Sequence, residues 1–348
     1  MNTTTTNSKG KSPVKGIAPN ASPEALTNDK RKVFLFGSPS YTNIGDQAIA
    51  YAIERFIRNH FPYYEYIEIM DYATDEGITL VQEIIRDDDI VCFTGGGNLG
   101  SLYTDIEEDR RKVISSFHNH RTIVFPQSVY FENNDHGEQE KRKTQDAYHS
   151  NANLTLVGRE NQTIDVLAET FAPDVNIMYT PDMVMSLDIV PKELKREGVL
   201  FVMRADKEKV TDEPFLEELK QWAQQIGKVE RIDTVLDEVD TIDYAEREHY
   251  LMNMLDTIGS QQLIITDRLH AMIFSIITRT PCLVFGNSYG KAKHSHIDWL
   301  HPVSFIEYTD SKDVQELEHI IERLMNADRE GIDLRSHFEP LKEFFKQK

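Results

Sequence analysis

The segment Thr266-Asp267-Arg268-Leu269-His270 carries the clearest chemical potential in this sequence. A short apolar run leads into it and apolar residues at helical spacing follow it, which predicts a strand and then a helix with Asp267 as N-cap. Arg268 and His270 then lie in the first helical turn, off the apolar stripe. Because the helix dipole already places partial positive charge there, two basic side chains suggest an anionic ligand. A capping Asp267 paired with Arg268, beside an incidental His270, is the alternative.

Further basic residues follow other predicted strands. Arg159 comes after the strand at 154–158 and Arg204 after the strand at 199–203. Since ligands of parallel α/β sheets bind beyond the carboxyl ends of the strands, these side chains could complete an anion pocket. A basic cluster follows the strand at 282–285 and could join them, formed by Lys291, Lys293, His294 and His296. The alternative for Arg159 is a salt bridge to Glu160, and the alternative for the cluster is a solvated basic face.

Two loops rich in small residues could bring the backbone close to a ligand. The first contains Asn43, Gly45 and Asp46 and precedes a helix that is predicted to begin near Asp46 or Gln47. The alternative is that Asp46 is only the N-cap of this helix. The second, Gly95-Gly96-Gly97-Asn98-Leu99-Gly100, matches the spacing of a dinucleotide fingerprint. The acidic residue required about twenty positions later is missing, so we expect backbone contact with another ligand. Three further polar residues follow strands and could line the same cleft: Gln127, Asp182 and Asn287. The alternative for Gln127 is a turn residue after Pro126, and the alternative for Asp182 is the cap of a turn.

Composition excludes several classes of function. Thirty-eight basic and 58 acidic residues give a formal charge of −20, which opposes binding to nucleic acid. No Cys and His spacing typical of zinc is present, and the sequence predicts no metal site. Apolar runs are too short to span a bilayer, and the two cysteines lie in predicted core strands. We therefore expect a cytoplasmic protein.

The elements that must position these residues alternate between β-rich runs and helical stretches from residue 32 onward. Repeated βαβ units predict an α/β fold with two Rossmann-like, doubly wound domains that face a cleft. The expected division has five parts, in chain order a disordered tail at 1–30, an N-terminal domain at 31–187, a linker at 188–197, a C-terminal domain at 198–330 and a closing helix at 331–348.

Six short motifs, each at the end of a predicted strand, together resemble the polysaccharide pyruvyl transferase family, in particular its bacterial exopolysaccharide-biosynthesis members. The resemblance spans roughly residues 33–289, and its motifs are Asn43-Ile44-Gly45-Asp46, Gly95-Gly96-Gly97-Asn98, Pro126-Gln127-Ser128, Gly158-Arg159-Glu160, Pro181-Asp182 and Asp267-Arg268-Leu269-His270. The cluster after Asn287 matches less clearly.

This resemblance implies a GT-B-like fold and transfer of a pyruvyl group from phosphoenolpyruvate to a sugar, with a ketal formed and phosphate released. The acceptor would be a sugar or a lipid-linked oligosaccharide, reached at the inner face of the membrane, and no cofactor would be needed. His270 is the expected general acid or base. The expected ligands of phosphoenolpyruvate are Arg268, Arg159, Arg204, Lys293 and His294.

Two alternatives stay open at the level of sequence. One is a GT-B glycosyltransferase that uses a nucleotide sugar, although the helix after His270 lacks the glutamate pair that many retaining members carry. The other is a sensor of sugars or nucleotides that has no catalytic activity. The sequence also leaves open the acceptor sugar, the ketal stereochemistry, the proton-transfer step that His270 serves and whether the chain forms a homo-oligomer.

Overall fold

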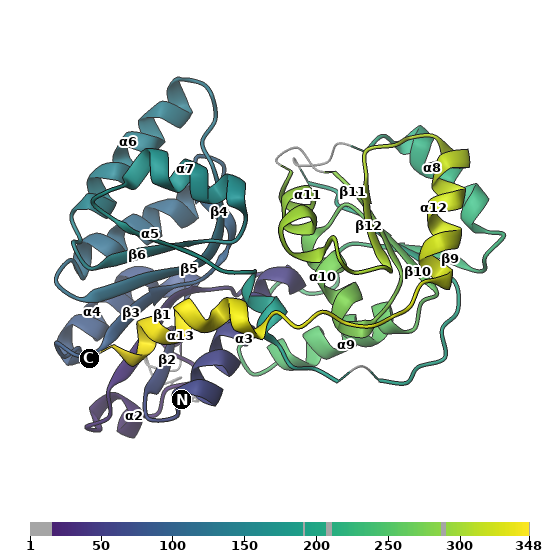
Figure 1. Cartoon of the computed structure of the whole chain (residues 1–348). Helices are drawn as coiled ribbons and strands as arrows, with labels where there is room; N and C mark the ends of the chain where they lie inside the picture. Colours follow the sequence, from purple (N-terminus) through teal and green to yellow (C-terminus); the bar gives the residue numbers. More distant parts are fainter. Residues whose placement is uncertain (1–15, 191, 207–210, 287–289, 348) are drawn as a thin grey trace, which may run out of the picture.

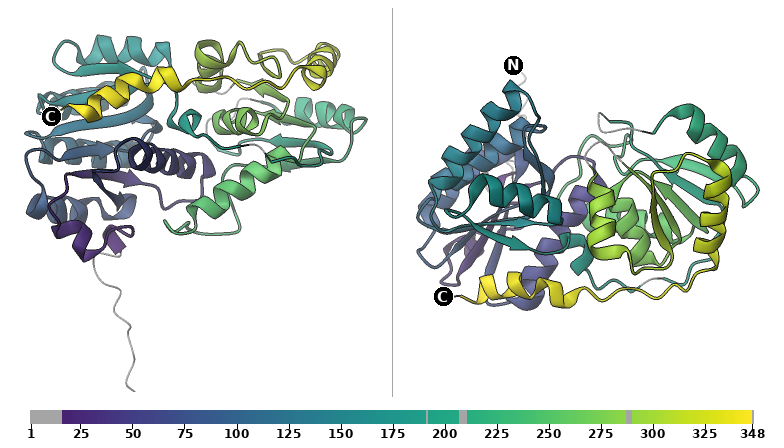
Figure 2. Two further views of the ribbon diagram at one scale, coloured as in Figure 1. Left: turned by 60° about the horizontal axis from the view of Figure 1, so that its bottom comes forward. Right: turned by 45° about the horizontal axis from the view of Figure 1, so that its top comes forward.

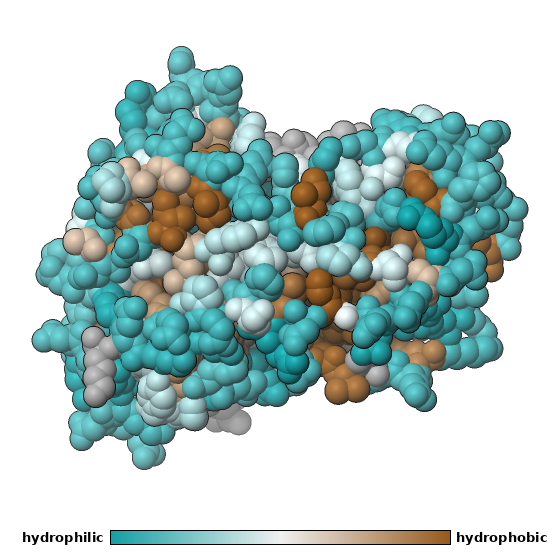
Figure 3. All heavy atoms as spheres, viewed as in Figure 1, coloured by the Kyte–Doolittle hydropathy of each residue, from teal (hydrophilic) through white to brown (hydrophobic). Residues whose placement is uncertain are grey.

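Two parallel sheets, each covered by helices, form the two halves of the computed structural model, which describes residues 16–190, 192–206, 211–286 and 290–347 (Figure 1). The views in Figure 2 show the two domains side by side, joined near their middle. The predicted α/β class and the two Rossmann-like domains are confirmed. Polar side chains cover most of the face in Figure 3, as expected for a chain with a formal charge of −20.

The N-terminal sheet has seven parallel strands. Their order is β2-β1-β3-β5-β6-β7, and β4 pairs with the C-terminal part of β5, at residues 127–130. The strands are β1 (Lys32–Ser38), β2 (Glu65–Met70), β3 (Ile90–Phe93), β4 (Gly96–Gly100), β5 (Arg121–Tyr130), β6 (Leu154–Gly158) and β7 (Asn176–Tyr179).

Helices pack on both faces of this sheet because its strands are apolar on both sides. One buried cluster includes Phe34, Phe36 and Val91 and is covered by four helices, α4 (Thr74–Ile84), α5 (Thr104–Ser116), α6 (Asp135–His149) and α7 (Asn161–Phe171). The other face, with Val33 and Leu35, packs against α3 (Ile44–His60). Two 3-10 turns complete the domain, η1 (Asp71–Ala73) and η2 (Met183–Ser186).

The C-terminal sheet has five parallel strands in the order β12-β11-β10-β8-β9. They are β8 (Val199–Val202), β9 (Val229–Ile232), β10 (Leu263–Thr266), β11 (Cys282–Phe285) and β12 (Ile306–Thr309). One face packs on α8 (Glu213–Ala223) and α12 (Val314–Asn326). The opposite face packs on α9 (Arg247–Gly259) and α10 (Leu269–Thr278), and the short helices α11 (Lys291–Ser295) and η3 (His296–Leu300) follow β11.

The chain ends on the domain in which it began. After η4 (Arg335–Phe338), helix α13 (Glu339–Lys346) packs on the N-terminal sheet (Figures 1 and 2). The Phe345 ring stacks on Phe125 at 6.2 Å, and the hydroxyl of Tyr64 donates to the carbonyl of Phe345 at 3.2 Å. This helix therefore ties the end of the C-terminal domain to the first sheet.

The two domains share a hydrophobic core. Helix α3 of the first domain packs directly on α9 of the second and on η2. Buried Ile49 and Ile53 of α3 belong to the same apolar cluster as Leu251 and Ile258 of α9. Burial of this continuous cluster fixes the two sheets relative to each other.

A buried ion pair lies inside this interface. Arg247, at the start of α9, is 1% exposed and donates from Nη2 to Glu68 of β2 at 2.6 Å. The same nitrogen lies 2.8 Å from the hydroxyl of Ser38, and Nε donates to Gln47 at 2.8 Å. A guanidinium from one domain is thus paired with a carboxylate of the other where water is excluded.

The prediction that residues 1–30 form a disordered tail is wrong for residues 16–30; residues 1–15 lie outside the described part of the chain. Helix α2 (Pro23–Thr27) forms here, and Leu26 is buried against the N-terminal domain. The side-chain nitrogen of Asn20 donates to Tyr66 O, and its side-chain oxygen accepts from Glu68 N. One side chain thus pairs with two backbone groups of the edge strand β2. A few apolar residues and one asparagine hold this segment against the N-terminal domain. The polar composition of residues 1–30 does not reveal these contacts.

Replacing Arg247 with Met should lower the free energy of unfolding by about 3–5 kcal/mol, because Glu68 would then be buried without its partner. Chemical denaturation of purified protein measures this change. Arg231 is the matched control, since its pair with Glu213 is exposed and Arg231→Met should cost less than about 1 kcal/mol. Equal losses in the two variants would contradict a special role of the buried pair.

Candidate functional site

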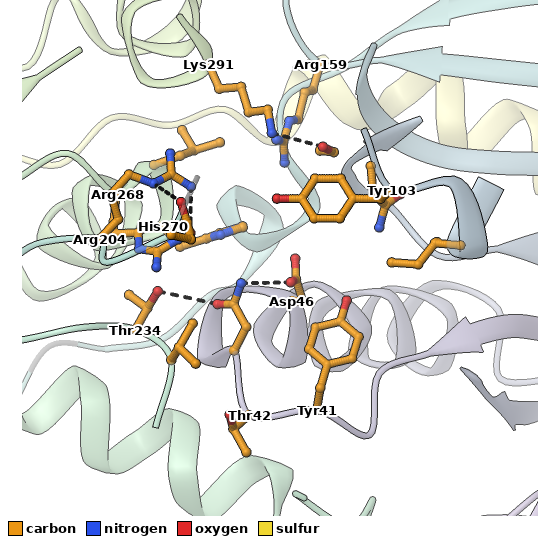
Figure 4. Close-up of a pocket in the computed structure, with 17 residues that line it drawn as sticks. Tyr41, Thr42, Asp46, Tyr103, Arg159, Arg204, Thr234, Arg268, His270 and Lys291 are labelled. Carbon is orange, nitrogen blue, oxygen red and sulfur yellow. Dashed lines mark hydrogen bonds and ion pairs between the residues drawn. The ribbon is translucent and has the colours of Figure 1, made fainter. Parts of the chain in front are cut away.

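A pocket of about 420 Å³ opens between the two domains, where the carboxyl ends of both sheets face each other (Figure 4). Its wall comes from loops after β1, β4 and β6 in the first domain and after β8, β9, β10 and β11 in the second. The lining residues are Tyr41, Thr42, Asn43, Asp46, Gly97, Asn98, Tyr103, Ile106, Arg159, Arg204, Asp206, Thr234, Val235, Arg268, Leu269, His270 and Lys291.

Asn43 organises the start of α3. Its side-chain oxygen accepts from Gly45 N at 3.0 Å, which makes Asn43 the N-cap, so the prediction that the helix begins near Asp46 is wrong. Its amide nitrogen donates to Asp46 at 2.8 Å. Across the domain interface, Ile44 N donates to Thr234 O at 2.8 Å, so the start of α3 is bound to the loop after β9. A cap from Asn43 places Asp46 one turn deeper, facing the pocket.

Asp46 is a buried carboxylate at the floor of the pocket. It accepts a hydrogen bond from the side-chain amide of Asn43 at 2.8 Å. Burial raises the pKa of Asp46 above its usual range, while His270 and Arg159 oppose that rise. A carboxyl with a raised pKa, held by a donor, is suited to exchange a proton with a substrate hydroxyl.

His270 enters from the second domain at the start of α10. Its Nε2 lies 3.6 Å from Oδ2 of Asp182, a residue that is 1% exposed, and its Nδ1 lies beside Gly45 of α3. A Cβ at position 45 would overlap Nδ1, so only glycine leaves room for the ring. Gly45, predicted as a backbone-contact residue, therefore makes space for the side chain of His270.

Arg159 faces the same carboxylate oxygen of Asp182 as His270 does and is 2% exposed. Its Nη1 donates to Asp182 at 2.6 Å, and its Nε donates to Ser128 at 2.8 Å and Glu160 at 3.1 Å. Nη2 points toward Gly97 and makes no hydrogen bond within the described part of the chain. The salt bridge left open by the sequence is present, and Arg159 also keeps one N–H edge for a ligand.

Lys291 meets Arg159 over Gly97. Its Nζ donates to the Gly97 carbonyl at 2.9 Å, and a Cβ at position 97 would meet both Lys291 and Arg159 (Figure 4). Lys293, predicted to bind the donor, instead pairs with Asp310 at 2.8 Å, outside the pocket. His294 lies beside Gly290 and does not line the pocket either. Lys291 and Lys293 lie on different sides of α11, so Lys291 points into the pocket and Lys293 points to solvent.

Arg204 and Arg268 form the wall on the side of the second domain. Both nitrogens of the Nε/Nη2 edge of Arg268 donate to Asp233, each at 2.7 Å, and Nη1 donates to Asp206 at 2.8 Å. Arg204 holds the same Asp206 with Nε at 2.9 Å and Nη2 at 3.2 Å. Arg268 is therefore already held by two carboxylates, and its remaining N–H groups belong to Nη1 and Nη2.

Asp267 does not cap α10, contrary to the prediction, because Arg268 occupies the N-cap position without a side-chain cap. Its Oδ1 accepts from Arg204 N at 2.9 Å. Its Oδ2 is buried and has no hydrogen-bond partner among the described residues. Burial raises the pKa of Asp267 to about 6. This carboxylate orders the loop that carries Arg204.

The predicted glycine loop is in part strand β4, paired with β5. Gly95 packs against the carbonyl of Pro126, and Gln127 donates to Thr94 O at 2.8 Å. Gly96, with φ of +142°, leaves space beside Asp46 and Asn98. Buried Arg110 donates to the side-chain oxygen of Asn98 and so holds that side chain in the pocket wall. The glycines allow close approach of the wall to the pocket.

Nine of the residues singled out from the sequence line the pocket, namely Asn43, Asp46, Gly97, Asn98, Arg159, Arg204, Arg268, His270 and Lys291. Four others support that lining from behind, namely Gly45, Gly95, Gln127 and Asp182. Gly96 lies between two of the lining side chains, and Asn287 lies outside the described residues. Sequence reasoning missed Tyr103, Thr234 and Val235, for which no motif gave a signal, and Asp206, which follows Arg204 by two positions.

The charges around the pocket nearly cancel. Four cations, Arg159, Arg204, Arg268 and Lys291, lie among five carboxylates, Asp46, Glu160, Asp182, Asp206 and Asp233. Pairing is what permits cations and carboxylates to be buried together. An anionic ligand would therefore meet N–H groups already fixed in direction, which reduces the entropy lost on binding.

No group of three or more His, Cys, Asp or Glu side chains in 16–190, 192–206, 211–286 and 290–347 is arranged to hold a metal ion. No helix in those ranges combines the length and the apolar character that crossing a membrane requires.

The chain is similar in sequence to several known proteins. A family model described as polysaccharide pyruvyl transferase matches residues 43–289. General stress protein 30 of Bacillus subtilis is 71% identical over 337 residues, covering 97% of this chain and 98% of that protein. Pyruvyl transferase 1 of Schizosaccharomyces pombe is 30% identical over 292 residues, covering 78% and 70%.

Among solved structures, UDP-GlcNAc 2-epimerase of Methanocaldococcus jannaschii matches with a TM-score of 0.52 at 12% identity, over 90% of this chain and 99% of that one. This likeness concerns the fold alone. It confirms the predicted GT-B-like arrangement of two Rossmann-like domains.

Replacing Asp267 with Asn should change how stability depends on pH. Because the folded pKa of about 6 lies above the unfolded value of 3.8, the folded state binds this proton more tightly, and the group's contribution to stability falls as pH rises from about 4 to 6. Full ionisation costs about 3 kcal/mol. Relative to wild type, D267N should therefore gain stability over this interval, as measured by denaturation at several pH values. The exposed Asp165→Asn is the control, and a parallel pH profile for D267N and wild type would contradict the prediction.

Proposed function

The chain belongs to the polysaccharide pyruvyl transferase family, and we propose that it moves a pyruvyl group from phosphoenolpyruvate to two hydroxyls of a sugar in an exopolysaccharide precursor, forming a ketal and releasing phosphate. The observation that carries this proposal is the single pocket in which His270 and Asp46 lie between two pairs of cations. A donor with a carboxylate and a phosphate needs cations on more than one side, and a chain of net charge −20 must supply them locally.

The two anionic groups of the donor can be assigned to the two pairs. One pair is Arg159, with its Nη2 edge, and Lys291, both beside Gly97. The other pair is Arg204 and Arg268, fixed by Asp206 and Asp233. Phosphoenolpyruvate bound across the pocket would place its reactive carbons between the pairs, next to His270 and Asp46.

The proposed reaction has two bond-forming steps. In the first, a sugar hydroxyl oxygen bonds to carbon 2 of phosphoenolpyruvate, its proton goes to a base, and carbon 3 takes a proton from an acid. In the second, a neighbouring hydroxyl oxygen bonds to carbon 2 and gives its proton to a base, while the bond from carbon 2 to the phosphate oxygen breaks and inorganic phosphate leaves. Arginines and Lys291 stabilise the departing phosphate, and no further cofactor is needed in this scheme.

His270 and Asp46 supply the proton transfers. Nε2 of His270 lies 3.6 Å from the carboxylate of Asp182, and we assign to His270 the proton that carbon 3 receives. Asp46 accepts a hydrogen bond from Asn43, and burial raises the pKa of Asp46, which strengthens it as a base for the sugar hydroxyl. The two groups reach the pocket from different domains, so the donor and acceptor can lie between them.

The remaining wall suits a sugar ring. Tyr41 and Tyr103 of the first domain, with Val235 of the second, give this part of the pocket an apolar lining with hydroxyl groups at its edge. Aromatic rings that pack on sugar faces while their hydroxyls bond to sugar oxygens are suited to this role. We propose that the acceptor, a free or lipid-linked sugar, binds here, and that the protein acts in the cytoplasm, at the membrane's inner face on lipid-linked acceptors.

Incubation with phosphoenolpyruvate and a panel of nitrophenyl and lipid-linked sugars tests the proposal. Phosphate should be released only in the presence of an acceptor, and the product should gain the mass of pyruvate less one water. A chelator should leave the rate unchanged. Thermal protection by a nucleotide sugar, without protection by phosphoenolpyruvate, would instead favour the glycosyltransferase. Binding of sugars or nucleotides without turnover would favour the sensor.

His270→Gln should lower kcat by about 10²-fold or more, because the proton to carbon 3 would lose its donor. Phosphate release under saturating substrates measures this. The exposed His301→Gln in the same domain is the control and should keep wild-type turnover. An H270Q enzyme that is folded and fully active would remove His270 from the mechanism.

Lys291→Met should weaken the apparent affinity for phosphoenolpyruvate by about tenfold, the order expected when one charge-assisted hydrogen bond is lost. Lys293→Met removes the same charge two residues away, from a side chain paired with Asp310 outside the pocket, and should have little effect. Thermal-shift titration with phosphoenolpyruvate compares the two variants. The reverse result, with K293M weakened and K291M unchanged, would contradict the assignment of Lys291 to the donor site.

A further inference from the structure

Asp182 lies where the polypeptide passes from β7 to η2, behind the pocket wall. Its Oδ1 accepts from Val184 N at 2.9 Å and caps η2, which fixes the orientation of the carboxylate. Its Oδ2 receives Nη1 of Arg159 at 2.6 Å and faces Nε2 of His270 at 3.6 Å. One oxygen atom therefore stands between the guanidinium and the imidazole.

The two ring nitrogens of His270 have different surroundings. Nε2 is buried, has no hydrogen-bond partner within the described residues and faces Asp182. Nδ1 lies beside Gly45 at the start of α3, next to the pocket, and forms no hydrogen bond within those same residues. A buried N–H with an ionised carboxylate in front of it prefers to keep its proton, because no other acceptor is within reach.

We propose that Asp182 is the positioning residue of His270: it holds a proton on Nε2 and so makes Nδ1 the nitrogen that exchanges protons with the substrate. The inference deepens the proposed function and rests on it. In the first step, the Nδ1–H bond breaks as the new C3–H bond forms, and the positive charge leaves the ring. Asp182 holds the proton on Nε2 throughout and compensates the positive charge of the ring when solvent protonates Nδ1 again.

Asp182 is ionised across the working range of the protein. Burial alone would raise its pKa, but His270 and Arg159 hold the pKa of Asp182 well below its usual range. Because Arg159 shares this oxygen atom, the donor-binding cation and the proton-transfer group are attached to the same carboxylate. Loss of Asp182 should therefore affect both turnover and donor affinity.

Several charged groups lie near His270. Two are carboxylates, Asp46 of α3 and Asp182 before η2. Two are cations beside these carboxylates, Arg159 after β6 and Lys291 of α11. Among the described residues, only Asp182 lies at ion-pair distance from Nε2, so a neutral residue at this position isolates its effect.

Asp182→Asn and Glu160→Gln are the matched pair for the test. Both remove a buried carboxylate from Arg159, and only Asp182 also contacts His270. D182N should lower kcat by about tenfold or more and move the limb of the pH–rate profile that reports His270. E160Q should change KM for phosphoenolpyruvate and leave that limb in place. A D182N profile with the wild-type limb would overturn the inference.

A readout independent of activity separates this inference from the proposed function. In two-bond ¹⁵N–¹H spectra of histidine-labelled protein, assigned with H270Q, the neutral ring of wild type should carry its proton on Nε2, and D182N should lose this preference. A wild-type ring protonated on Nδ1 overturns the inference even if D182N does not fold. An Nε2 tautomer that depends on Asp182, in a protein without pyruvyl transfer, supports the positioning and contradicts the proposed function.

Discussion

The packing of α3 on α9 is the constraint on which the site depends. Helix α3 belongs to the first domain, yet its apolar residues share one buried cluster with α9 of the second, and the Arg247–Glu68 pair lies within the same interface. The start of α3 presents Asn43 and Asp46 to the pocket. Fixing this helix against the second domain therefore fixes Asp46 relative to His270, although each residue is attached to a different sheet.

The same interface explains why position 45 is a glycine. A side chain there would displace the ring of His270, so the close approach of the two domains requires the smallest residue at the start of α3. Backbone bonds across the interface, such as Ile44 N to Thr234 O, keep this approach in register. The proton-transfer groups are held by packing and hydrogen bonds rather than by their own flexible side chains, which favours a preorganised site.

Pairing of charges shapes the chemistry of the pocket. Each arginine in the wall is fixed by at least one carboxylate, with Arg159 on Asp182, Arg204 on Asp206 and Arg268 on Asp233. Such pairs compensate the cost of removing charge from water, and they also restrict which N–H groups remain for a ligand. The wall therefore discriminates by the direction of its donors more than by an excess of positive charge.

By itself, the sequence determined the α/β class, the two domains and the strand ends at which Arg159, Arg204 and His270 lie, because apolar periodicity and strand–helix alternation are local properties. Only the tertiary structure decided which polar residues meet. Asn43 rather than Asp46 caps α3, Lys291 rather than Lys293 faces the pocket, and residues 16–30 dock on β2. Asp182 and His270 are far apart in the chain and 3.6 Å apart in space. Such contacts depend on loop paths and on the packing of one domain against the other, which no short stretch of sequence encodes.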